Sequence, residues 1–162
     1  MNQESFERLV ADARTQTMAD LREALRVASL DVLKKLAVDL VPPLFRAGYD
    51  GELAATGHHW ADAWARPRTT ALPRFLVRIH RGVFSEDDAI RLREAMHGGH
   101  IEQAALVVIS ETPLRPGARD ALGSAVPWIV DTDGLINLML NANLGITTQV
   151  YEAKSLDNGY FR

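Results

Sequence analysis

The N-terminal forty residues place apolar side chains at helical spacing. The first group occupies positions i, i+3, i+4 and i+7: Phe6, Leu9, Val10 and Ala13. This pattern predicts an amphipathic helix with one apolar face. Thr17 followed by Asp20 resembles a capping signal and predicts that a second helix starts there. A further apolar run over residues 30–40 is expected to end at Pro42 and Pro43, because proline lacks an amide donor and its ring clashes with the preceding turn.

Between Gly48 and Gly82 the pattern changes to short strands, "GELAAT", "ADAWA" and "RFLVRIHR", with turns marked by Gly57 and Pro67. The third strand alternates strictly. One face carries Phe75, Val77 and Ile79, and the other carries Leu76, Arg78 and His80. A strand that is otherwise built for burial therefore places a guanidinium and an imidazole side by side on one face.

After Gly82, helices and apolar strands alternate. Ser85 and Asp88 predict a capped helix that ends at Gly98-Gly99, and "ALVVIS" reads as a strand buried on both faces. The following elements are a short helix from Pro116-Gly117 toward Leu122, a buried strand "PWIV", a helix after Asp133-Gly134 and a terminal strand over residues 147–154. This order predicts an α/β fold with a mixed central sheet flanked by helices, preceded by an N-terminal helical arm.

The composition indicates one globular domain. The chain has 162 residues, 47% of them hydrophobic, and its longest apolar runs have six residues, whereas a membrane span needs roughly 20. The absence of cysteine and of a recognisable secretory signal favours a cytoplasmic location without membrane attachment.

Charge is distributed unevenly along the chain. The net charge of -3 argues against a uniformly basic nucleic-acid-binding protein. Residues 63–82 nevertheless contain no acid and five arginines: Arg66, Arg68, Arg74, Arg78 and Arg81. This cluster predicts a nucleic-acid-binding surface formed by Arg66, Arg68, Arg74 and Arg81. The alternative is that these arginines occupy ordinary solvated loop and edge positions.

Asp62 lies on the strand before Arg78 and His80. If the two strands pair, their spacing of about 4.8 Å brings the three side chains close together. An acid beside a strand with two polar positions is the layout of a metal-dependent phosphodiesterase.

From about Leu30 onward the chain resembles the Mrr-type restriction endonuclease domain, a branch of the PD-(D/E)xK nuclease superfamily. The matching pieces follow one another as "RAGY", the acid of "WADAWA", "FLVRIHR", "SEDDAIRLREAM", "ALVVIS", "PWIVDTDGLINLML" and "NLGITTQVYEAKSLDNGYF". The resemblance implies a helical arm over residues 1–28 and a restriction-endonuclease-like domain over residues 29–162.

The resemblance also assigns the family's catalytic positions. Its metal-binding Asp falls on Asp62, its Glu or Gln on Arg78 and its Lys on His80. Arginine cannot bind a cation, and neutral imidazole is a poor ligand for Mg²⁺. The motif is therefore predicted to be degenerate, with Asp62 a metal ligand only if the protein is active and with no cofactor expected otherwise.

Other motifs have simpler interpretations. Glu152 and Lys154 form an isolated (D/E)xK triplet on the predicted terminal strand, remote from the family's active centre. The histidines at 58, 59, 97 and 100 could hold a transition metal but are expected in solvated loops. The tryptophans at 60, 64 and 128 are expected in the core or an interface.

Three functional hypotheses follow. The leading one is a catalytically degenerate module of a restriction or defence system that binds nucleic acid or assembles with a partner. The second is an active Mg²⁺-dependent DNA endonuclease, and the third is a protein-interaction scaffold that does not bind nucleic acid. The N-terminal helices are candidates for pairing with a second copy or a defence-system partner.

Overall fold

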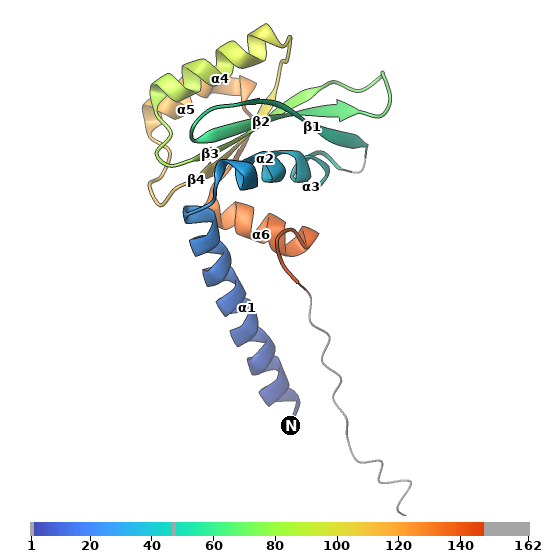
Figure 1. Cartoon of the computed structure of the whole chain (residues 1–162), viewed down its shortest axis with the longest axis vertical. Helices are drawn as coiled ribbons and strands as arrows, with labels where there is room; N and C mark the ends of the chain where they lie inside the picture. Colours follow the sequence, from blue (N-terminus) through green and yellow to red (C-terminus); the bar gives the residue numbers. More distant parts are fainter. Residues whose placement is uncertain (1, 47, 148–162) are drawn as a thin grey trace, which may run out of the picture.

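The computed structural model describes residues 2–46 and 48–147. One five-stranded sheet has the order β1-β2-β3-β4-β5. Its strands are β1 (Tyr49–Thr56), β2 (Trp60–Pro67), β3 (Phe75–Arg81), β4 (Ala104–Ile109) and β5 (Trp128–Val130). The first three strands form an antiparallel meander, and β3, β4 and β5 run parallel. The predicted α/β fold with a mixed sheet is confirmed (Figure 1).

Helices cover both faces of this sheet. They are α1 (Gln3–Arg26), α2 (Leu30–Asp39), α3 (Val41–Phe45), α4 (Glu86–Gly98), α5 (Pro116–Leu122) and α6 (Thr132–Ala142), and a 3-10 turn (Gly123–Ala125) follows α5. One face carries α2, α3, α6 and the last turns of α1, and the other carries α4 and α5. None of the helices in the described ranges is long and apolar enough to cross a membrane.

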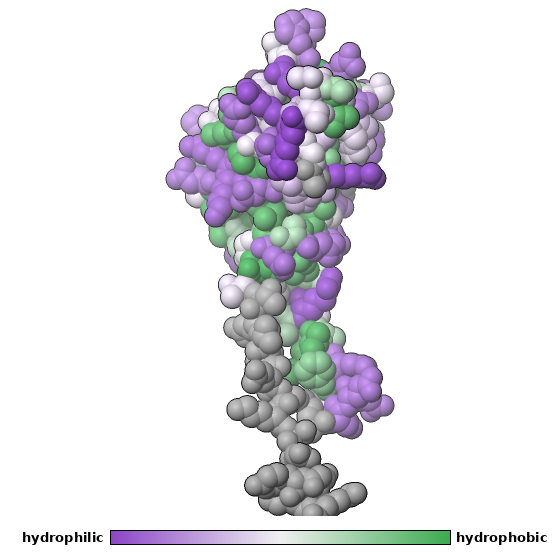
Figure 2. Space-filling view, turned by 90° about the vertical axis from the view of Figure 1, so that its right-hand side faces the viewer, coloured by the Kyte–Doolittle hydropathy of each residue, from purple (hydrophilic) through white to green (hydrophobic). Residues whose placement is uncertain are grey.

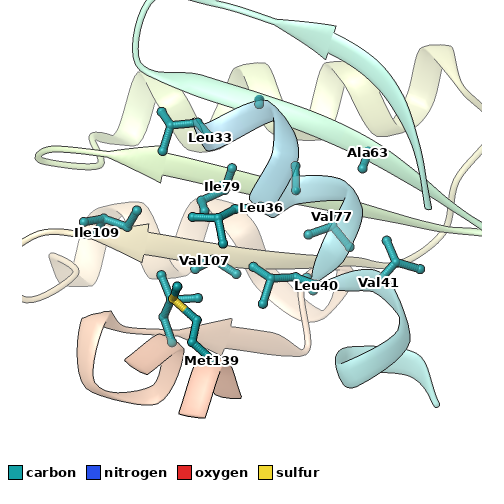
Figure 3. Close-up of a cluster of buried hydrophobic side chains, with 14 of the residues drawn as sticks. Leu33, Leu36, Leu40, Val41, Ala63, Val77, Ile79, Val107, Ile109 and Met139 are labelled. Atoms are coloured by element: carbon teal, nitrogen blue, oxygen red, sulfur yellow. The ribbon is translucent and has the colours of Figure 1, made fainter. Parts of the chain in front are cut away.

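The alternation of β3 divides the core between these two layers. Val77 and Ile79 point toward α2, where they meet Leu33, Leu36 and Leu40 (Figure 3). On the opposite face, Leu76 packs with side chains of α4 and β4. Arg78 and His80 lie on that second face, next to a buried apolar layer. The predicted division of these side chains between the two faces of β3 is confirmed.

The start of α4 also follows the prediction. The Ser85 hydroxyl accepts from the amide of Asp88 at 3.1 Å, and the Asp88 carboxylate accepts from the amide of Ser85 at 2.9 Å. This reciprocal capping box satisfies two amides that a helix start leaves free. It also fixes Asp88 near the end of β3.

One expectation for the N-terminal region was wrong and another was confirmed. No helix starts at Thr17, because α1 continues through it and its hydroxyl donates to the carbonyl of Ala13 at 2.9 Å instead of accepting an amide. The helix over residues 30–40 ends before Pro42 and Pro43, as predicted, since α2 stops at Asp39; the two prolines then lie in the first turn of the short helix α3, which was not predicted. Proline is tolerated in a first helical turn, where the amides have no partner within the helix.

The segment "PWIV" forms a strand, as predicted, but the expectation that this strand is buried was wrong. β5 has only three residues and lies at the sheet edge, so Trp128 is exposed while Ile129 and Val130 are half-buried. The predicted terminal strand over residues 147–154 and the Glu152-Lys154 motif lie outside the described residues, apart from Thr147.

The first half of α1 extends away from the sheet (Figure 1). Residues 3–16 are exposed, whereas Leu21 and Leu25 are the buried residues of this helix. The helix is therefore anchored to the domain only through its C-terminal turns.

Candidate functional site

Asp62 and Arg78 form a buried ion pair between neighbouring strands. They stand directly opposite each other in the antiparallel register of β2 and β3. Arg78 donates through Nε to Oδ1 of Asp62 at 2.7 Å and through Nη2 to Oδ2 at 2.8 Å. The exposed fractions of the two side chains are 3% for Arg78 and 2% for Asp62. Both carboxylate oxygens are thus engaged by one planar cation.

Trp60 covers the guanidinium of this pair. The guanidinium carbon of Arg78 lies 4.0 Å from the centre of the indole ring, which is the geometry of a cation-π contact. The tight turn before β2 supports this arrangement, because the amide of Gly57 donates to the carbonyl of Trp60 at 2.9 Å. A side chain at Gly57 would collide with the indole ring. Glycine at this position therefore leaves room for the indole ring that covers the ion pair.

The donor set around Asp62 does not fit a Mg²⁺ site. Burial raises the pKa of Asp62, while the hydrogen bonds and charge of Arg78 act in the opposite direction. A cation bound to Asp62 would lie beside a fixed guanidinium, and Mg²⁺ sites rely on carboxylate, carbonyl or water oxygens. Within residues 2–46 and 48–147, no three His, Asp or Glu side chains converge as a possible metal-binding group.

His80 is held in a separate set of contacts at the end of β3. Its Nε2 lies 3.2 Å from the carbonyl oxygen of Val83, which can only accept, so Nε2 carries the proton of this hydrogen bond. The ring packs edge-on against Phe84 at 5.1 Å between centroids. Burial lowers the pKa of His80, although the carboxylate of Asp88 lies 3.9 Å away and opposes the shift. His80 is consequently a neutral donor and not a substitute for a fixed ammonium group.

An open groove follows the carboxyl ends of β3 and β4, and we call it the edge groove. It consists of two adjoining cavities of about 640 and 270 Å³, which share Arg26, Arg81, Gly82 and Val83 in their walls. The remaining lining residues are Arg22, His59, His80, Asp88, Ile109, Ser110, Glu111 and Thr132. Asp62 and Arg78 line neither cavity, so His80 is the motif position that borders the groove.

Three arginines contribute to the edge groove. Arg26 pairs with Glu23 at 2.6 Å in an exposed contact, and Arg22 pairs with Asp133. Arg81 forms no ion pair with any of the described residues. Sequence analysis did not identify Arg22 and Arg26, because they lie 53 and 49 positions before the start of β3 and come near it only through the packing of α1.

The arginines predicted to bind nucleic acid occupy different environments. Arg66 pairs with Glu52 at 2.8 Å, and Arg68 pairs with Asp50 at the same distance. Arg74 donates to the carbonyl of Gly99 at 2.9 Å and lies over Trp64. Arg81 lines the edge groove. The structure therefore does not gather the four side chains on one anion-facing surface, and their role in binding stays a prediction.

The other candidate residues do not form sites in the described regions. The four histidines at positions 58, 59, 97 and 100 are exposed, as expected. Trp128 packs edge-on against Phe45 and Phe75 at 5.3 and 5.4 Å between ring centroids, which agrees with its expected structural role.

Comparison with known proteins supports the fold. No protein-family model matches the chain, and no curated protein sequence matches it. Among solved structures, the chain is similar to the DNA modification-dependent restriction endonuclease AspBHI, with a TM-score of 0.54 and 15% sequence identity. The match covers 79% of this chain but only 36% of that protein. The chain thus has a restriction-endonuclease-like fold and spans about a third of the length of the enzyme it resembles.

Proposed function

We propose that this chain is an Mrr-like domain that does not cleave DNA but binds nucleic acid through the edge groove. The proposal includes a cytoplasmic restriction or defence system as its setting, and it includes neither a resident metal nor a cofactor. It rests on the restriction-endonuclease-like fold and on the chemistry of the side chains at the family's catalytic positions.

The buried pair of Asp62 and Arg78 carries the proposal that cleavage is lost. A working site needs carboxylates that face solvent and share a metal ion. Here the single carboxylate is held by a guanidinium at 2.7 and 2.8 Å under the ring of Trp60. If Arg78 moved away so that Asp62 could bind a metal ion, its guanidinium charge would remain buried without a partner, which would destabilise the fold.

The edge groove supports the proposal that binding is retained. Among the described residues, Arg22, Arg26 and Arg81 line it together with the carboxylates of Asp88 and Glu111. Arginine side chains can contact DNA phosphates, and such contacts position a protein on DNA without reading the base sequence. The similar protein AspBHI is a DNA modification-dependent restriction endonuclease, so duplex DNA is the first ligand to test.

The test measures affinity for a duplex oligonucleotide against salt concentration, by fluorescence anisotropy. If Arg26 and Arg81 contact phosphates, replacing both with glutamine lowers the affinity and flattens the log-log salt slope by up to about two units, since each contact contributes about 0.9. Lys34→Gln removes one positive charge from α2, at a position that lines neither cavity of the edge groove, and serves as the control. We expect this control to retain the wild-type slope.

Other outcomes select among the alternatives. A loss of affinity in an Arg66→Gln, Arg68→Gln variant, with the groove variant unchanged, would move the binding surface to the β1-β2 hairpin. No binding to duplex or single strands at low salt by the folded protein would favour an interaction scaffold. Strand cleavage that requires Mg²⁺ or Mn²⁺ would establish the endonuclease and overturn the proposal.

A further inference from the structure

A cavity of about 710 Å³ lies at the carboxyl ends of β4 and β5, and we call it the β4-β5 cavity. Small-molecule sites commonly have volumes of about 300 to 1,000 Å³, and in open α/β sheets they lie beyond the carboxyl ends of the strands. The projecting part of α1 also carries apolar surface (Figure 2), but on a helix that extends from the domain and not in a recess. The apolar residues that line the cavity are Val108, Pro113, Leu114, Ile129, Val130 and Leu138.

The charged groups of this cavity complement those of the edge groove. The edge groove is lined by three arginines and two carboxylates, whereas the β4-β5 cavity is lined by two arginines and three carboxylates. Arg22 and Glu111 belong to both linings, so the cavity and the groove adjoin. A nucleotide has the same division of charge, because its phosphate is an anion and its base is neutral and carries N–H donors. The charged residues of the cavity are Arg22, Glu111, Arg119, Asp131 and Asp133.

Glu111 is the acid of the cavity that is available to a ligand. Asp133 pairs with Arg22, and Asp131 accepts a hydrogen bond from the amide of Gly134 at 2.8 Å at the start of α6. Glu111 forms no ion pair with any residue in the described ranges. Its exposed carboxylate therefore retains its capacity to accept hydrogen bonds at the boundary between the cavity and the edge groove.

The buried side chain of Thr132 holds the loop that carries Glu111. Its hydroxyl accepts from the amide of Ser110 at 3.1 Å and donates to the carbonyl of Ser110 at 3.1 Å. The Ser110 hydroxyl in turn accepts from the amide of Thr112 at 3.0 Å. Both neighbours of Glu111 are thus hydrogen-bonded, which fixes the backbone at this position.

The free side chains of the cavity suit a base with an exocyclic amino group. Cytosine presents an amino donor at the position where thymine and uracil present a carbonyl oxygen, and a carboxylate accepts from the former but not from the latter. Arg119 has no ion-pair partner among the described residues. A planar guanidinium of this kind can stack on a base, while apolar side chains receive the rest of the ring.

We infer that the β4-β5 cavity binds the base of a nucleotide, with Glu111 accepting a hydrogen bond from the exocyclic amino group. The phosphate lies in the edge groove against Arg26 and Arg81. The inference rests on the proposed function for these phosphate contacts, and it goes further by assigning a base preference. The nucleotide is either free or part of a single strand, because taking a paired base out of a duplex costs unpairing and unstacking energy.

Two pyrimidine ligands that differ in one exocyclic group test the inference. Calorimetric titration of the full chain compares deoxycytidine monophosphate with deoxyuridine monophosphate, and fluorescence anisotropy compares single-stranded oligonucleotides of the same two bases. We expect the wild type to bind the cytosine ligand about tenfold more tightly, which is the scale of one specific base contact. Glu111→Gln should remove most of this preference, because a glutamine amide can also donate to the uracil carbonyl. Glu102→Gln is the matched control, since it makes the same change two residues before β4 instead of two residues after it, and should keep the preference.

The two kinds of ligand distinguish the sources of the nucleotide. A preference for cytosine in the mononucleotide identifies a free nucleotide as a ligand, and a preference confined to the oligonucleotide identifies a nucleic-acid strand; both results support the inference. Equal affinity for the two bases in both forms, no binding of either form, or an undiminished preference in Glu111→Gln would overturn it. The proposed function fails on a different observation, which is an Arg26→Gln, Arg81→Gln variant that binds duplex DNA with the wild-type salt slope.

Discussion

Two arginines on β3 lie three positions apart and have opposite environments. Arg78 is buried, bonded at two points to Asp62 and covered by Trp60. Arg81 lines the edge groove and has no ion-pair partner among the described residues. Arg78 lies within β3, on the face that α4 and α5 cover, whereas Arg81 lies at the carboxyl end of the strand. A cluster of like residues in sequence is therefore not one surface, and each guanidinium must be assigned its own role.

The largest expected difference between these two arginines concerns stability. Asp62→Ala leaves the guanidinium of Arg78 buried without its partner, which costs about 3 to 5 kcal/mol of unfolding free energy. Arg81→Ala removes a solvated side chain and should change stability by less than about 0.5 kcal/mol. Urea denaturation of both variants checks this. Similar losses in the two variants would mean that the pair does not have the expected structural role.

Restoring the family's residues is the next test of the pair. An Arg78→Glu, His80→Lys variant places two carboxylates and an ammonium at the three motif positions. If Asp62 is correctly aligned with the family, the variant should bind Mg²⁺ and gain about 2.7 kcal/mol of unfolding free energy at a hundredfold excess over Kd. The wild type should gain nothing at the same concentration. A folded variant without a Mg²⁺ response would show that Asp62 is misaligned or that more ligands are needed.

A smaller effect is expected from His80, which lies between the two arginines. Burial lowers the pKa of its imidazole, so the folded protein binds this proton less readily than the unfolded chain does. Arg78 and His59 add to the lowering, while Asp88 and the Val83 carbonyl oppose it. The contribution of His80 to stability is therefore complete above about pH 6.5 and is lost as the pH falls below that value.

Urea denaturation between pH 8 and pH 5 measures this dependence. His80→Gln should reduce the loss of stability on acidification, and His58→Gln, at an exposed position, provides the control. Equal pH dependence in the wild type and the His80 variant would contradict the expected role of burial.

The smallest effect is expected on the β1-β2 hairpin. Arg68 and Asp50 are both more than half exposed, and exposed pairs of this kind contribute little to stability because water screens their charges. Hydrogen bonding to Arg68 lowers the pKa of Asp50. A double-mutant cycle with Arg68→Gln and Asp50→Asn should give a coupling energy far below the loss expected for Asp62→Ala, and 0.5 M salt should reduce it. A larger coupling that does not respond to salt would show that the hairpin pair resembles the buried one.

Local patterns in the sequence determined much of the fold. Strict alternation in residues 75–80 set the two faces of β3, since a strand directs successive side chains to opposite sides. The Ser85 and Asp88 capping box needs only residues within one helical turn, and the pattern located it correctly. The pairing of β2 with β3 also follows from a short connection, which placed Asp62 beside Arg78.

Tertiary structure alone decided which charges meet and which face solvent. The partners of Arg66 and Arg68 come from β1, and the second wall of the edge groove comes from α1, far away in sequence. Likewise, only the strand order left "PWIV" at an edge, although its apolar run was typical of a buried strand. The periodicity that predicts a helix or a strand depends on neighbours a few residues away. The partner of a charged side chain, or the place of a strand in the sheet, depends instead on segments that are far apart in the sequence and meet only in the folded protein.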